Sequence, residues 1–211
     1  MISLVAATEW NTKGVSSMVS GDYEAALLSF RQALDVARLV APNATIPYSQ
    51  AQAFCLEEVQ CESIDTQASC TVFDKCFNIL VNEVFSGNPT KSQVDFVIAI
   101  VLYNVGLACQ LEGQRQSLQK VMYCEKAMRI YSMSASVAQG IGATQENFAV
   151  LLATANNMAC LSLEKFDFES FYCYREWMGC LIISNKQFHN VFFSSNFAAS
   201  HNVQERPAPA A

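Results

Sequence analysis

Apolar residues spaced three or four apart mark amphipathic helices along this chain. Residues 21–38 carry one such stripe, formed by Tyr23, Ala26, Leu27, Phe30, Ala33, Leu34 and Ala37. Upstream, Trp10, Gly14 and Met18 recur every fourth residue, and Ser20-Gly21 ends the run. Residues at this spacing share one helix face, so the pattern predicts a helix–turn–helix hairpin over about 4–39. Asp22 follows the turn and is expected to cap the second helix.

Two further hairpins are predicted at about 93–133 and 145–184. In the second hairpin we expect Gly113 to end the first helix. The residues expected to line the next helix are Leu118, Val121, Met122, Ala127, Met128 and Tyr131. In the third hairpin, Asp167 is expected to cap the second helix. Residues 134–144 are rich in Ser, Ala and Gly, a composition that predicts a mobile connecting loop.

The segment 42–92 interrupts the helical pattern as a long insertion. It begins with "APNATIPYSQ" and ends with "SGNPTK", and both are typical of turns. Between them, "CTVFDKCFNILVN" is compatible with a short extended piece or a helix, and the pattern does not choose. We expect residues 185–199 to form a capping helix that completes a single domain over 1–199, with 200–211 as a disordered tail.

Seven positions of the first hairpin resemble the tetratricopeptide repeat, a helical hairpin of about 34 residues that stacks on its neighbours. They are Gly14, Gly21-Asp22-Tyr23, Ala26, Phe30 and Ala33. The spacing between the hairpins is longer and less regular than in an ordinary array. The order of the pieces is similar to a group of uncharacterised tetratricopeptide-like proteins expanded in some algal lineages. The resemblance implies an all-α fold of three antiparallel helical hairpins, stacked as a short α-solenoid with a long insertion after the first.

In this repeat family the first helices line a concave groove that holds a partner segment. The resemblance places Asn104 and Asn157 at equivalent groove-facing positions, with Asn11, Tyr103, Gln110 and Asn156 as weaker candidates. An amide offers two donors and one acceptor, which suits an extended backbone of any sequence. The alternative is that each asparagine bonds a neighbouring helix and stabilises the stack.

The negative net charge of the chain argues against some classes of binding partner. The net charge is −6 and no basic patch occurs, which argues against nucleic acid. The family's clamp for acidic chaperone tails uses three cations, and the aligned positions here are Asn11, Val15, Asn104, Ala153 and Asn157. Because only Asn104 keeps the family's residue, we expect a partner segment that is not acidic. The run 96–111, which is uncharged, and the run 148–164, which ends at its first charge, are too short for membrane spans.

Catalytic and metal chemistry find little support in the sequence. None of the nine cysteines forms a C-x-x-C pair, and the two histidines, His189 and His201, lie far from the cysteines. We therefore expect no enzyme activity, no cofactor and no metal. With no secretory signal pattern, the thiols are expected to be reduced, in a cytoplasmic or nuclear compartment.

Sequence analysis thus predicts a non-enzymatic protein–protein interaction module, a scaffold or adaptor. Two alternatives stay open. One is a cysteine-based metal or redox protein that uses Cys55, Cys61, Cys70 and Cys76. The other is a purely structural subunit of a larger complex.

Overall fold

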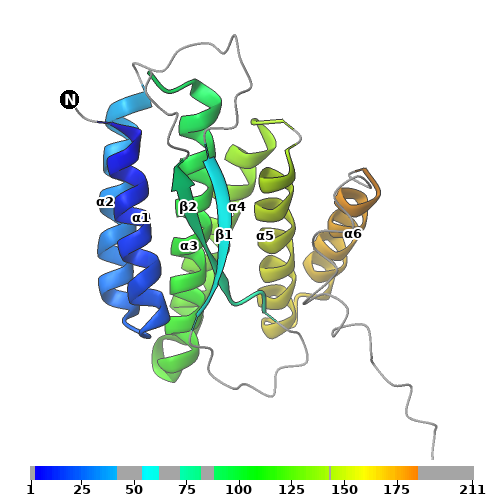
Figure 1. Cartoon of the computed structure of the whole chain (residues 1–211). Coiled ribbons are helices and arrows are strands. Elements are labelled where there is room, and N and C mark those ends of the chain that lie inside the picture. Colours follow the sequence, from blue (N-terminus) through cyan, green and yellow to red (C-terminus); the bar gives the residue numbers. More distant parts are fainter. Residues whose placement is uncertain (1–2, 42–53, 62–71, 82–87, 143, 185–211) are drawn as a thin grey trace, which may run out of the picture.

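A computed structural model describes residues 3–41, 54–61, 72–81, 88–142 and 144–184. These residues are mostly helical (Figure 1). The helices are α1 Leu4–Val19, α2 Tyr23–Val40, α3 Lys91–Arg115, α4 Lys120–Gln139, α5 Gln145–Glu164 and α6 Phe168–Ser184, with a short 3-10 turn at Ser117–Gln119. The expected helix at 185–199 and the expected tail at 200–211 lie outside the described residues.

The six helices form three contacting pairs, α1 with α2, α3 with α4 and α5 with α6, as the apolar stripes predict. Side-chain caps fix where several of them begin. Asp22 accepts a hydrogen bond from the Ala25 N–H at 3.0 Å, and Asp167 accepts one from the Ser170 N–H at 3.1 Å. Thr90 and Gln93 form a reciprocal capping box at the start of α3. Each cap satisfies N–H groups that the first helical turn leaves without partners.

Glycines let the helices of the first two pairs approach closely. A Cβ added at Gly14 of α1 would lie 2.3 Å from the ring of Phe30 in α2. A Cβ at Gly106 of α3 would lie 2.7 Å from the ring of Tyr131 in α4. Each glycine therefore sits beneath a buried aromatic ring of the partner helix, which fixes the distance between the two helices.

Three local expectations are wrong. Helix α3 continues through Gly113 to Arg115, and α4 continues through the expected loop to Gln139. Ser134 is buried in α4 and donates a hydrogen bond to the Ala99 carbonyl of α3 at 2.7 Å, which helps to hold this part of the chain in place. Of the six apolar residues expected to line the second helix of this hairpin, Ala127 and Tyr131 are buried, whereas three are exposed: Leu118, Val121 and Met122.

The all-α expectation is wrong within the insertion, where two antiparallel strands occur. Strand β1 spans Phe54–Gln60 and strand β2 spans Lys75–Val81, with Leu56 opposite Ile79 and Val59 opposite Cys76. The β-hairpin lies across the side of the molecule formed by α1, α3 and α5 (Figure 1). Strand β2 is the buried member of the pair, and Cys76, Phe77 and Ile79 belong to the main hydrophobic core.

Helix α3 runs through the centre of this arrangement. Among the described helices, it alone is long and apolar enough to cross a membrane by length and composition. However, 83% of its most apolar window is buried inside the protein, against the neighbouring helices and β2. That burial accounts for its apolar sequence, as in the core helix of a helical bundle.

Candidate functional site

Three buried asparagines from three different helices meet β2 and the residues just before it. Asn11 lies on α1, Asn104 on α3 and Asn157 on α5, and none has measurable exposure to solvent. We call these three residues the asparagine clamp. A buried amide is costly unless it is hydrogen-bonded, so the partners of each side chain decide what the clamp does.

Asn104 and Asn11 together hold the backbone of Phe77. The Asn104 Oδ1 accepts a hydrogen bond from the Phe77 N–H at 2.9 Å, and its Nδ2 donates to the Phe77 carbonyl at 2.8 Å. Asn11 donates to the same carbonyl at 3.0 Å, and Asn104 donates its other N–H to the Asn11 Oδ1 at 2.9 Å. Asn104 thus bonds the backbone of the protein's own strand β2 and a side chain of the neighbouring helix α1 at the same time. The second of these bonds is of the kind expected for an asparagine that stabilises the helix stack.

Asn157 binds the backbone of Phe73 in the same way. Its Oδ1 accepts a hydrogen bond from the Phe73 N–H at 2.8 Å, and its Nδ2 donates to the Phe73 carbonyl at 3.0 Å. Two asparagines on different helices therefore each bind the N–H and the C=O of one residue. Because Phe73 and Phe77 are four positions apart on an extended segment, both bonded groups face the same side of it.

Two buried tyrosines extend this hydrogen-bond network, Tyr103 by contacting the segment and Tyr131 by contacting Asn157. The Tyr103 hydroxyl lies 3.1 Å from the carbonyl oxygens of both Phe73 and Lys75, and the Tyr131 hydroxyl accepts a hydrogen bond from Asn157 at 3.0 Å. Burial raises the pKa of Tyr103 and of Tyr131 well above their usual value. Both phenols therefore stay protonated at neutral pH and keep a proton to donate.

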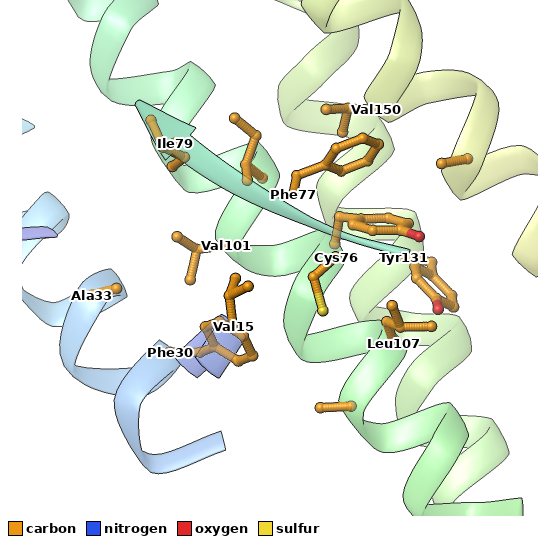
Figure 2. Close-up of a cluster of buried hydrophobic side chains, with 14 of the residues drawn as sticks. Val15, Phe30, Ala33, Cys76, Phe77, Ile79, Val101, Leu107, Tyr131 and Val150 are labelled. Atoms are coloured by element: carbon orange, nitrogen blue, oxygen red, sulfur yellow. The ribbon is translucent and has the colours of Figure 1, made fainter. Parts of the chain in front are cut away.

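Aromatic packing holds the side chains of the bound segment. The rings of Phe73 and Phe77 stack with 5.8 Å between centroids, and Phe77 lies 5.0 Å from the Tyr103 ring. Figure 2 shows Phe77 pointing toward Val150, with Cys76 pointing away from it on the same strand. Phe77 is completely buried and Phe73 is 6% exposed, so the segment is embedded in the core.

A third anchor joins α1 to β2 one residue beyond Phe77. The Thr12 hydroxyl donates to the Asn78 Oδ1 at 2.8 Å, and the Asn78 amide donates to Glu57 of β1 at 3.1 Å. Helix α1, β2 and β1 are thereby connected side chain to side chain. These bonds add to the backbone pairing of β1 with β2 and link both strands to the helical framework.

The structure brings four of the six sequence-predicted residues onto the bound segment: Asn11, Asn104, Asn157 and Tyr103. Gln110 is buried and accepts a hydrogen bond from Tyr131 at 2.9 Å. Asn156 donates to the Asn157 Oδ1 at 3.3 Å. These two support the side chains that make the contacts. Sequence reasoning missed Tyr131 and Thr12, because nothing in their helix positions distinguishes them before the occupant of the face is known.

The described cysteines of the alternative hypothesis, Cys55, Cys61 and Cys76, do not lie together as a metal site. Within the described ranges, no group of three or more His, Cys, Asp or Glu side chains is arranged to hold a metal ion. Cys61 and Cys76 are in contact, Cys55 contacts the Leu80 carbonyl, and Cys70 lies outside the described residues. Seven described cysteines have free thiols, but Cys160 of α5 takes part in a disulfide, so the expectation of reduced thiols throughout is wrong at that position.

The geometry suits the retention of an extended peptide backbone. The described hydrogen bonds to Phe73 and Phe77 come from neutral amides and a phenol, and none of them selects a particular side chain. The aromatic surroundings select instead for bulky apolar side chains four residues apart. The comparisons add no relative to this picture: no family model, curated protein or solved structure matches this chain.

Proposed function

We propose that this protein is a non-enzymatic protein–protein interaction module of tetratricopeptide-like design, in which three stacked helical hairpins present the asparagine clamp to an extended segment. The single observation that carries the proposal is the paired recognition of backbone at Phe73 and Phe77 by Asn157 and Asn104. Strand β2 is the resident occupant, and a partner segment binds by replacing it. The tetratricopeptide likeness rests on the hairpin pattern and on the glycine–aromatic crossings.

The contacts define the chemistry of the partner. It is an extended peptide with bulky apolar residues four positions apart, and its backbone takes the hydrogen bonds now made by β2. No cation takes part in the described contacts, and the chain carries a net charge of −6, so an acidic segment would gain no compensating charge. A neutral or basic segment fits this environment.

Exchange of β2 is opposed by its own burial. Withdrawing Phe77 and Ile79 from the core exposes two side chains whose burial is worth about 1.5–3 kcal/mol each. A partner therefore binds with an affinity reduced by the small fraction of molecules in which β2 is displaced. Weakening β2 slightly is expected to strengthen partner binding, which gives the proposal a distinctive test.

The test uses a labelled peptide with the sequence of residues 72–81, in which serine replaces Cys76. Fluorescence anisotropy is expected to show weak binding to the wild type and tighter binding to Phe77→Leu, whose own strand competes less well. Asn104→Ala in the Phe77→Leu background is expected to abolish binding. Gln139→Ala, at an exposed position on α4, is the matched control and should leave binding unchanged.

Absence of binding to Phe77→Leu, with the variant still folded by circular dichroism, would contradict the exchange proposal. The asparagine clamp would then serve the fold alone, and the alternative of a purely structural subunit would be favoured by the deep burial of Phe77. A peptide with serine at both phenylalanine positions is the specificity control and should not bind.

A further inference from the structure

Cys61 and Cys76 form a buried pair of thiols where the two strands meet. Cys61 follows the last residue of β1, and its N–H donates to the Asp74 carbonyl at 3.2 Å, so it continues the antiparallel pairing by one position. Since Val59 is opposite Cys76, the two cysteines are diagonal neighbours across the strands. Their sulfur atoms are 2.7 Å apart, compared with about 2.05 Å in a disulfide bond.

We propose that Cys61 and Cys76 are a site of disulfide formation that ties β1 to β2. The oxidant is a peroxide, small enough to reach the pair when the hairpin opens slightly. One thiol loses its proton and its sulfur attacks the peroxide, which leaves a sulfenic acid and releases water. The second sulfur then displaces the hydroxyl group as water and forms the S–S bond. Overall, two S–H bonds and one O–O bond break, and the dithiol gives two electrons to the peroxide.

The environment keeps the pair reduced until the hairpin opens. Cys61 is 3% exposed and Cys76 is fully buried. The hydrogen bond with Cys61, followed by burial, raises the pKa of the Cys76 thiol well above its usual value, so little thiolate is present at neutral pH. Oxidation is therefore expected to be slow in the closed hairpin and rapid in its second step, because the resolving sulfur is already adjacent.

A bond at this position has a direct consequence for β2. The strand would be covalently joined to β1, and β1 is itself connected to α1 through Asn78 and Glu57. With the bond in place, the open hairpin has fewer conformations available to it. The closed state is therefore stabilised relative to the open state. The proposal that the disulfide forms is based on the geometry of the two cysteines alone. Its effect on partner exchange rests on the proposed function.

The experiment treats the fully reduced protein with hydrogen peroxide and maps disulfides by mass spectrometry of peptides under non-reducing conditions. The expected product is a peptide pair joined at Cys61 and Cys76, two hydrogens lighter than the reduced pair. Cys55→Ala should give the same product, and Cys76→Ala should not. Exposed Cys173 and Cys180 serve as internal evidence that the oxidant has reacted. Oxidation of those two while Cys61 and Cys76 remain thiols would overturn the proposal.

Hydrogen exchange gives a second readout that does not depend on a variant folding. In the wild type with the Cys61–Cys76 disulfide, backbone amides of β2 should exchange at least roughly tenfold more slowly than in the reduced wild type. Equal exchange rates would show that the bond does not restrain the strand, and would overturn its assigned effect. If the link forms but the labelled peptide binds the linked and reduced proteins equally, the disulfide stands and strand exchange fails. If the peptide binds but no disulfide forms, strand exchange is supported and the disulfide proposal fails.

Discussion

The Asn104 side chain uses both of its donors and its acceptor in one buried place. It binds the N–H and the C=O of Phe77 and also donates to Asn11 on the neighbouring helix. An isolated buried amide would destabilise the fold, whereas this one is fully satisfied. Its placement could be predicted from sequence, because it precedes Gly106 by two residues as Asn157 precedes Ala159. The residue that Asn104 binds, Phe77, could not be predicted, because it comes from a distant part of the chain.

Gly14 is the residue at which the packing of the first helix pair is most tightly limited. Gly14→Ala would place a methyl group 2.3 Å from the Phe30 ring, a distance that real Cβ contacts do not show. We expect a loss of about 1–3 kcal/mol in the free energy of unfolding, measured by urea denaturation. Gly179→Ala on α6 is the matched control, because nothing lies within 4 Å of its added Cβ. That variant should be neutral or stabilising, since alanine favours helix. Equal effects of the two substitutions would be inconsistent with a close crossing at Gly14.

At the scale of elements, the helices could be predicted and the strands could not. The stripe of α2 is readable because this helix has one buried and one exposed side, where Phe30 and Ala33 are buried and Arg31 is exposed. Strand β2 has no such contrast. Four consecutive residues from Cys76 to Ile79 are buried, so side chains on both faces of the strand are covered. A strand buried on both faces loses the alternation by which sequence patterns identify strands.

The ends of two helices were misjudged for a related physical reason. Gly113 and the small residues 134–139 favour turns in isolation, yet both lie inside helices. Gly113 sits against the Tyr123 side chain, where an added Cβ would lie 2.8 Å away, and Ser134 bonds the Ala99 carbonyl. Small residues at these positions allow close helix contact. At Gly113 and Ser134 that tertiary packing outweighs a low helix propensity.

At the scale of the whole molecule, the buried tyrosines make stability sensitive to alkaline pH. Unfolded tyrosine titrates at about pH 10, and burial raises the pKa of Tyr103 and Tyr131 well above that in the folded protein. Their stabilising contribution is complete below about pH 10 and falls as the pH rises toward the folded pKa, because only the unfolded state then loses these protons. The expected loss is about 1.4 kcal/mol per pH unit for each tyrosine.

Urea unfolding between about pH 8 and pH 11 measures this dependence. Tyr131→Phe should reduce the alkaline slope by the contribution of one tyrosine, whatever its effect on absolute stability. Tyr172→Phe, at a position 67% exposed, is the matched control and should keep the wild-type slope. Identical slopes in all three proteins would mean that the two phenols titrate alike in the folded and unfolded states.

The three hairpins and the β-hairpin are held as one unit by the asparagine clamp. Asn11, Asn104 and Asn157 come from the three first helices, and all three converge on a segment of only a few residues. Removing one amide is therefore expected to release one bonded residue of β2 or of the extended segment just before it, while the helices keep their own contacts. The central claim is that the asparagine clamp holds extended backbone residue by residue.

Hydrogen exchange of individual backbone amides, followed by NMR, tests that claim most directly. In Asn104→Ala, the Phe77 amide should exchange roughly tenfold faster or more, because it loses its acceptor. In Asn157→Ala, the same acceleration should appear at Phe73 instead. Core amides of α2 should keep their wild-type rates in both variants, as should every amide in the Gln139→Ala control. An unchanged Phe77 amide in Asn104→Ala, or equal acceleration of β2 and α2, would contradict the account.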